Sequence, residues 1–384
     1  MATAQHLSEV AQALAAQGHE VTVVAGRRAY DNPDKLFPAR ENWRGIRIFR
    51  VFSTRFGKAA KWRRAADFAS FIFTCCGRIL FMRRHDVVLA LTTPPLISFI
   101  GAWRAKLWGA KFCYWVMDFN PDEAIAAGWL RADSFTGKML ERMSRFSLRR
   151  ADRIIALDRF MRDRIVAKGI ASEKIAVIPP GALDGEAYFD AAGRERFRQA
   201  HGLADKFVVM YSGNHSPVHP LDTLLAAAEQ LAADDAIRFC FVGGGSEFKR
   251  VKKWAAEGAW KNIVCLPYQP LNELSASLSA ADAHVVVMGD AMLGLVHPCK
   301  IYNILAVGAP VLYIGPAPSH VTEILALEQS HPAASVRQGE AGRLAQEIRA
   351  MAQTGRTGPR TVPAVLTAQF GQAAVLPRLL AEII

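Results

Sequence analysis

Glycine, asparagine and histidine gather in the stretch MYSGNHSPVHPLDTLL (residues 210–225), directly after a short apolar run. Where a strand runs into a helix, backbone N–H groups lack partners and the helix dipole is positive, so anions bind there. Gly213 permits close approach of the backbone. The side chains of Asn214, His215 and His219 can donate hydrogen bonds, and a bound diphosphate would raise the pKa of a facing histidine. The stretch predicts a phosphate-binding loop, with an ordinary strand-to-helix turn as the alternative.

Two later stretches could complete such a site. The sequence GGGS (243–246) precedes a predicted helix, and its glycines would again let a ligand approach the backbone. In GLVHPCKIYNILAVGAPVLYIG (294–315), Lys300 begins a predicted helix, where its ammonium would meet a phosphate as a point charge. Asn303 follows one helical turn later, on roughly the same face. The three stretches together predict a site for a phosphorylated ligand.

Carboxylates are concentrated in VMDFNPDE (116–123). Asp118 is a candidate for a loop or helix-capping carboxylate, and Asp122 and Glu123 are candidates for caps of the next helix. A divalent-ion site would need further acidic ligands at suitable spacing, which the sequence lacks, so no metal is expected. No pair of carboxylates has the arrangement typical of glycoside hydrolases.

The elements that position these residues alternate between strand and helix, which is typical of parallel sheets covered by helices on both faces. Strands are predicted at 19–26, 46–52, 86–95, 111–123, 151–158 and 174–182, and again at 207–212, 237–245, 262–268, 283–289 and 309–315. The pattern lapses around 183–206. We therefore predict an α/β chain of two Rossmann-like domains, 1–190 and 191–364, and a C-terminal helix at 365–384 that crosses back to the first domain. Ligands of such domains bind at the carboxyl ends of the strands, here in a cleft between the domains. Because the sequence opens with a helix, the first domain is expected to lack its leading strand, either because the sequence is truncated before Met1, which is favoured, or because the domain has no such strand.

Composition narrows the partners and the compartment. The 384 residues carry a formal net charge of +12, which favours an anionic partner. The six scattered cysteines and the lack of a cleavable signal peptide indicate a reducing, cytoplasmic location. Residues 55–84 combine basic and aromatic side chains, but Asp67 and Arg78 interrupt the apolar run, so a transmembrane span is not expected. The stretch predicts either a buried helix or contact with an anionic membrane surface. Binding of nucleic acid is not expected, since no stacking platform accompanies the charge.

Several stretches together resemble a GT-B glycosyltransferase of family 4, the retaining class that uses nucleotide sugars. The matching stretches run in the family order through nearly the whole chain: GHEVTVVAG, VMDFNPDE, RADRIIALDRFM, KIAVIPPGA, YSGNHSPVHPLDTLL, FVGGGSE, LPYQPLNELSASLSAADAHVVVM and HPCKIYNILAVGAPVL. Within the family the chain is most similar to the bacterial L-fucosaminyltransferase-like group, which builds exopolysaccharide and O-antigen.

The resemblance implies transfer of a hexosyl or N-acetylhexosaminyl group from a nucleotide-diphosphate donor, with a UDP-sugar favoured, to a lipid-linked or saccharide acceptor. It implies a peripheral position on the inner face of the cell membrane and no separate cofactor. The implied catalytic residues are Asp118, facing the donor across the cleft, and Lys300, beside the diphosphate. Asp122 and Glu123 would bind acceptor hydroxyls. The implied donor-binding residues are Gly213, Asn214, His215, His219, Gly244, Gly245, Tyr268, Gln269 and Asn303, of which Tyr268 and Gln269 would read the nucleobase and Asn303 the ribose.

Four positions depart from the family pattern. The family often has Arg and Lys where this chain has Asn214 and His219, and two glutamates where it has Leu295 and Asn303. These departures keep two alternatives open, a sugar-nucleotide-binding subunit without catalytic activity and another GT-B enzyme such as a sugar-nucleotide 2-epimerase.

Overall fold

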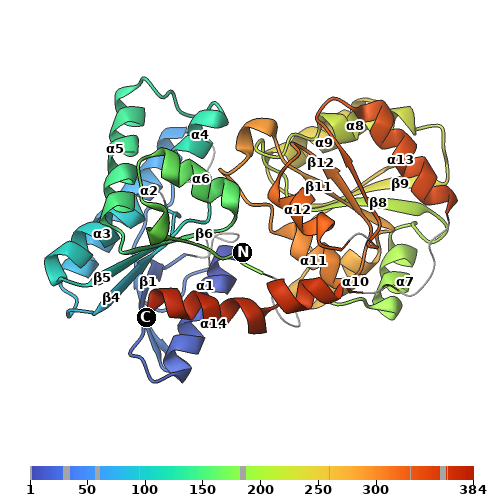
Figure 1. Cartoon of the computed structure of the whole chain (residues 1–384). Coiled ribbons are helices and arrows are strands. Elements are labelled where there is room, and N and C mark those ends of the chain that lie inside the picture. The colour runs from blue at the N-terminus through green and yellow to red at the C-terminus, as the bar shows by residue number, and fades with distance from the viewer. Residues whose placement is uncertain are drawn as a thin grey trace.

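The computed structural model describes residues 2–28, 35–56, 61–94, 96–181, 187–258, 260–328, 330–354, 360 and 362–384. The chain forms two α/β domains that lie side by side (Figure 1). The strands of the first are β1 (Thr22–Gly26), β2 (Arg40–Trp43), β3 (Ile46–Val51), β4 (Val87–Ala90), β5 (Lys111–Trp115), β6 (Arg153–Ala156) and β7 (Ile175–Val177). Its helices are α1 (Ala2–Ala16), α2 (Lys61–Leu80), α3 (Ile97–Trp108), α4 (Asp122–Ala126), α5 (Phe135–Arg150), α6 (Arg159–Ala167) and the 3₁₀ turn η1 (Ser172–Lys174).

The strands of the first domain form two sheets. One has the order β1-β3-β2, with β1 and β3 parallel and β2 antiparallel to β3. The other is fully parallel, with the order β4-β5-β6-β7. Within the described part of the chain no strand ladder joins β1 to β4, so these two sheets are separate.

The second domain contains one six-stranded parallel sheet with the order β10-β9-β8-β11-β12-β13. Its strands are β8 (Phe207–Asn214), β9 (Ile237–Gly244), β10 (Ile263–Leu266), β11 (Ala283–Val287), β12 (Val311–Ile314) and β13 (Ala333–Val336). Its helices are α7 (Ala191–Ala200), α8 (Asp222–Gln230), α9 (Ser246–Glu257), α10 (Leu274–Ser279), α11 (Lys300–Ala306), α12 (His320–Ala326) and α13 (Ala341–Gln353), with short turns η2 (Leu271–Glu273) and η3 (Asp290–Met292). Helix α7 lies within the stretch where the apolar pattern lapses.

The strands of both main sheets are apolar over most of their length because both faces are covered by helices. In β11, for example, every residue is buried, and β12 is the same. Some helix starts are fixed by local caps: the Asp158 carboxylate accepts a hydrogen bond from the Met161 N–H at 2.8 Å, which begins α6.

The C-terminal segment returns to the first domain. After the π-helical turn η4 (Leu366–Phe370), α14 (Gln372–Ile383) lies along that domain (Figure 1). Val375, Leu379, Leu380 and Ile383 are buried in the core that also contains β5 and β6. Arg153 of β6 forms an ion pair with Glu382. The core of the first domain is thus completed by the last helix of the chain.

Candidate functional site

Four loops of the second domain meet at one edge of its sheet. They follow β10, β9, β8 and β11, which are consecutive in the strand order. The chain leaves β8 toward β9 and β10 on one side and resumes with β11 on the other, so the order reverses between β8 and β11. Ligands of open parallel sheets bind at such a reversal, outside the carboxyl ends of the strands.

Two glycine-containing loops are in direct contact at this edge. The parallel register of β8 and β9 pairs Gly213 with Gly243 and Asn214 with Gly244. Gly243 has a φ of +135°, and a Cβ atom there would be 2.0 Å from the Gly213 carbonyl oxygen. Only glycine fits this contact. The two loops therefore present backbone at the surface where a ligand would approach.

The ammonium of Lys300 lies beside the first of these loops. Its Nζ is 3.5 Å from the centroid of the Tyr211 ring, and a Cβ on Gly213 would be 3.8 Å from it. Nζ is buried without a hydrogen-bond partner among the described residues, although the stem of the side chain is part-exposed. Burial lowers the pKa of Lys300 to about 7. A buried donor without a partner is costly, and an anion bound at Gly213 would satisfy it.

The two histidines of the first loop differ in their surroundings. His215 is fully buried, its ring packs edge-on against Tyr211, and its Nδ1–H donates to the Gly213 carbonyl at 2.9 Å. Burial, and then the charge of Lys300, lower the pKa of His215 to about 4. The same two causes lower the pKa of His219 to about 3, and its Nδ1 is buried with no partner in the described part of the chain. Both rings are therefore neutral in the empty site, and a raised pKa for His219 would require the bound anion.

The other predicted donor-binding residues lie around these loops. The Asn214 side chain reaches over the second loop, because a Cβ on Gly245 would be 2.8 Å from its Oδ1. Tyr268, after β10, packs against Gly244, where a Cβ would be 3.0 Å from the ring. The half-buried Gln269 side chain donates to the Pro267 carbonyl at 3.0 Å.

Asn303 lies on α11 one turn after Lys300 and is half-buried. The structure thus brings Gly213, Asn214, His219, Gly244, Gly245, Tyr268 and Lys300 to one edge of the sheet.

Across the domain boundary, Asp118 follows β5 and its backbone N–H donates to the Thr92 hydroxyl at 3.2 Å. Burial raises the pKa of Asp118, and His297 of the second domain opposes that rise. The pKa of Glu123 is also raised, by burial and then by the charge of Asp118. The sequence did not predict this pair of interacting carboxyl groups. Because each disfavours ionisation of the other, the pair tends to retain a proton near neutral pH.

Asp122 interacts with a different partner from this carboxyl pair. Its carboxylate forms an ion pair with Lys168 at 2.7 Å, and Lys168 also pairs with Glu141 at 2.7 Å. The residue begins α4 but does not cap it, since the N-cap position is Pro121.

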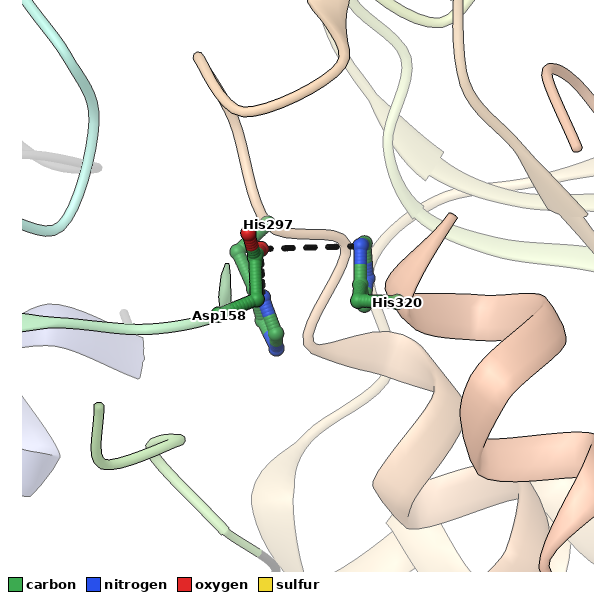
Figure 2. A group of neighbouring side chains, drawn as sticks. All are labelled: Asp158, His297 and His320. Carbon is green, nitrogen blue, oxygen red and sulfur yellow. Dashed lines mark hydrogen bonds and ion pairs between the residues drawn. The ribbon is translucent and has the colours of Figure 1, made fainter. Parts of the chain in front are cut away.

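A buried cluster of Asp158, His297 and His320 connects the two domains (Figure 2). His297 Nδ1 is 2.8 Å from Asp158 Oδ2, and His297 Nε2 is 2.8 Å from the Tyr302 hydroxyl. His320 Nδ1 is 3.7 Å from the same carboxylate oxygen. Burial would raise the pKa of Asp158, but the hydrogen bond and charge of His297 hold it below its ordinary value. Asp158 is thus an ionised carboxylate inside the protein. Sequence reasoning missed this cluster because its members come from distant segments, and only the HPCK stretch signalled His297.

The cluster has the residue types of a metal site but not the geometry of one. The rings of His297 and His320 are stacked, with centroids 3.9 Å apart and planes at 23°. Two imidazoles that share an ion direct their in-plane lone pairs at it, whereas stacked rings direct theirs along adjacent planes. The arrangement suits a hydrogen-bonded contact between the domains.

The surface of the first domain carries exposed aromatic side chains at α2. Phe73 on α2 is 79% exposed, and Phe81 just beyond the helix is 86% exposed. Phe71 is half-buried instead and packs toward Gly26. Within the described ranges, no helix combines the length and the apolar character needed to cross a bilayer.

Comparison with known proteins gives two family matches that together cover most of the chain. Residues 2–181 match the family described as "Glycosyl transferase 4-like domain", and residues 193–351 match "Glycosyl transferases group 1". WcaI of Escherichia coli (strain K12), named as a colanic acid biosynthesis glycosyl transferase, is 26% identical over 352 residues, covering 86% of this chain and 83% of WcaI. WbjE of Pseudomonas aeruginosa, named as a glycosyltransferase, is 27% identical over 243 residues, covering 63% of this chain and 60% of WbjE.

Solved structures share the fold at low sequence identity. WaaG, a glycosyltransferase involved in lipopolysaccharide biosynthesis, superposes with a TM-score of 0.67 at 16% identity, over 99% of this chain and 95% of that one. HepE from Anabaena, solved in complex with UDP-glucose, has a TM-score of 0.66 at 15% identity, over 88% and 87%. The likeness establishes the GT-B fold of two Rossmann-like domains.

Proposed function

Since the chain belongs to the GT-B glycosyltransferases of group 1 (family 4), we propose that it transfers a hexosyl or N-acetylhexosaminyl group from a UDP-sugar to a lipid-linked or saccharide acceptor, with retention. The observation that carries the proposal is the buried Nζ of Lys300 beside Gly213, which has no hydrogen-bond partner among the residues that the structure describes. The names of WcaI and WaaG support a place in the synthesis of cell-surface polysaccharide, and HepE with UDP-glucose supports a UDP-linked donor.

The chemistry that we propose at the donor side is stabilisation of the leaving diphosphate. Negative charge builds up on the diphosphate as the glycosidic bond breaks and the sugar becomes oxocarbenium-like. The Lys300 ammonium and the backbone N–H groups near Gly213 would be fixed in advance to receive that charge. His219 would add a donor once the anion raises its pKa. Tyr268 and Gln269 would bind the base, and Asn303 the ribose.

At the acceptor side, Asp118 and Glu123 form the carboxyl pair that would hold acceptor hydroxyls. A pair that retains one proton can both donate to and accept from a hydroxyl. A phosphate oxygen of the donor would take the acceptor proton, so neither carboxyl needs to be the base. We assign no acceptor contact to Asp122, because Lys168 occupies its carboxylate.

The membrane side of the proposal depends on α2. Phe73 and Phe81 would enter the headgroup region, and the neighbouring exposed Arg83 and Arg84 would attract anionic lipids on the cytoplasmic face. Sedimentation with liposomes that contain an anionic lipid tests this. The double variant Phe73→Ser/Phe81→Ser should lose binding, whereas Leu271→Ser, an exposed apolar residue of the second domain (62% exposed), should not. Binding that does not depend on anionic lipid would refute the membrane contact.

The proposed activity is tested by calorimetry with UDP and then by turnover of a UDP-sugar panel with membrane extract as acceptor source. We expect UDP binding, transfer of one donor, and an unchanged anomeric configuration by NMR of the product. UDP binding without turnover would instead indicate a binding subunit, and release of an epimerised sugar nucleotide an epimerase. No binding of UDP or of other nucleoside diphosphates would refute the donor site.

A further inference from the structure

A loop of the second domain is docked into the first domain. Leu295, in the loop 293–297, is 2% exposed and belongs to the hydrophobic core of the first domain. Its carbonyl accepts a hydrogen bond from the Phe119 N–H at 2.8 Å. A Cβ on Gly294 would be 2.6 Å from the Phe160 carbonyl oxygen, so the backbone lies directly against α6. Loop 293–297 therefore packs on the first domain, although the chain on either side of it belongs to the second domain.

The side chain that completes this docking is His297, and Asp158 determines its hydrogen bonds. Because the Asp158 carboxylate is ionised and can only accept, His297 Nδ1 must carry the proton and donate it. His297 Nε2 lies 2.8 Å from the Tyr302 hydroxyl on α11. His320, stacked on His297, closes the other side of the ring. One carboxylate of the first domain thus contacts both His297 and His320 (Figure 2), and His297 in turn contacts Tyr302 on α11.

The same loop leads directly into Lys300, the first residue of α11. Lys300 Nζ has no hydrogen-bond partner within the described part of the chain and lies over the Tyr211 ring, so its position beside Gly213 depends on this contact and on where α11 begins. That start is held from the first domain, at Phe119 by the backbone and at Asp158 through His297.

We propose that Asp158 is a positioning residue of the donor site: through His297 it docks loop 293–297 on the first domain and so places the Lys300 ammonium beside Gly213. Its link to catalysis rests on the proposed function, whereas its effect on Lys300 does not. The donor site is accordingly complete only while the two domains are in contact.

Charged groups of α6 also face the contact: Arg164 donates to the Leu293 carbonyl of the same loop at 3.2 Å, and Arg159 forms an ion pair with Glu323 of α12. Asp118 and Asp158 of the first domain both act electrostatically on Cys299, and the charge of His297 acts on the pKa of Asp118. His219 acts on His320 from the side of the donor loop, and Lys300 acts on His219. The Asp158 carboxylate has His297 and His320 as its only cationic-capable partners among the residues described.

Three variants separate docking from helix capping. In Asp158→Ser the hydroxyl still caps α6, since serine is a good N-cap residue, but it is too short to reach His297. In Asp158→Asn the amide caps α6 and can donate to His297 Nδ1, if the imidazole takes its other tautomer and donates Nε2–H to Tyr302. His297→Phe keeps a ring against His320 and loses both hydrogen bonds. Asp163→Asn is the matched control, because that exposed α6 carboxylate pairs only with Arg162.

The first readout needs no nucleotide: the pH dependence of acylation of Lys300 by a small amine reagent, followed by mass spectrometry. In the native protein half-maximal reaction should fall near pH 7. In Asp158→Ser and His297→Phe it should move by at least one pH unit toward the ordinary lysine value, because a displaced Nζ reaches water. Asp158→Asn should restore most of the native value, and Asp163→Asn should equal it. An unchanged Lys300 titration in Asp158→Ser and His297→Phe overturns the proposal, whether or not the protein binds UDP.

The second readout is UDP affinity by calorimetry. Asp158→Ser and His297→Phe should weaken binding about tenfold, and Asp158→Asn less than threefold. A moved Lys300 titration with UDP affinity unchanged would overturn the link between the docked loop and the donor site. Failure of native protein to bind UDP would refute the proposed function while the first readout still decides the positioning role.

Discussion

The low pKa of Lys300 makes donor binding a proton-uptake reaction. In the empty site burial lowers this pKa to about 7, so the side chain is largely neutral above that pH. A diphosphate beside Nζ favours the ammonium and should return the pKa toward its ordinary 10.5. Each UDP bound above pH 7 must therefore be accompanied by a proton taken from the solvent.

The size of the effect follows from linkage. With a free pKa of about 7, only about a tenth of Lys300 is charged at pH 8, so binding takes up about 0.9 proton per UDP. The Kd should rise about 50-fold between pH 7 and 9, approaching tenfold, or ~1.4 kcal/mol, per pH unit. In the free protein His215 and His219, with pKa values of about 4 and 3, are neutral throughout this range, so His219 adds to the proton uptake only as far as the bound anion raises its pKa above about 7. The phosphate of UDP, with its second pKa near ~6, is already ionised.

Calorimetry in buffers of different ionisation enthalpy measures both the Kd and the number of protons taken up. Lys300→Met should bind UDP weakly with a Kd that is flat from pH 7 to 9. Lys253→Met, which removes an exposed lysine of α9, should behave like the native protein. A native Kd that is independent of pH, with no proton uptake at pH 8, would refute the reasoning.

Three further outcomes are expected. Lys300→Ala should lower kcat/KM about 10- to 1000-fold, the range for loss of one charge-stabilising group, and native kcat/KM would exclude Lys300 from the reaction. His219→Ala should show a defect in kcat/KM that grows at lower pH, because the free histidine is neutral above about pH 3 and its imidazolium forms only with the bound anion; equal pH profiles would exclude an imidazolium in the bound state. Leu380→Ala should lower the free energy of unfolding by about 2–5 kcal/mol through a cavity in the first-domain core, with exposed Ala381→Ser as the control in denaturant unfolding.

Most of the strand and helix order was predictable because parallel strands covered on both faces are apolar runs. The strand predicted at 111–123 ends at Trp115, since the residues beyond it turn toward the domain boundary. Helix α7 was hidden because only Phe197 and a few small residues face its core, while Arg198 is buried against Asp282. Strand β2 was not predicted from the sequence because its residues, RENW, are only partly buried and mostly polar.

The candidate site likewise contains residues that the sequence predicts and residues that only the tertiary structure brings together. Local glycine and lysine signals identified the loops after β8 and β9 and the start of α11, because each is encoded in one short segment. Asp158 and His297 could not be paired from sequence, since 139 positions separate them and only the packing of two domains brings them together. Leu295, at a position where the resemblance suggested a sugar-binding glutamate, is instead an apolar anchor in the other domain. The interaction between Asp118 and Glu123 was likewise not predictable, because it depends on their burial in the tertiary structure.

The return of α14 has a consequence for the order in which the protein forms during synthesis. Domains near the N-terminus usually fold first as the chain leaves the ribosome. Here the first domain cannot bury the face around β6 until Val375, Leu379 and Ile383 have emerged, after the second domain. The first domain therefore exposes apolar surface until synthesis is complete. A fragment that ends between the two domains would expose the same surface permanently. Such a fragment would need a chaperone, or α14 added as a peptide, to remain in solution.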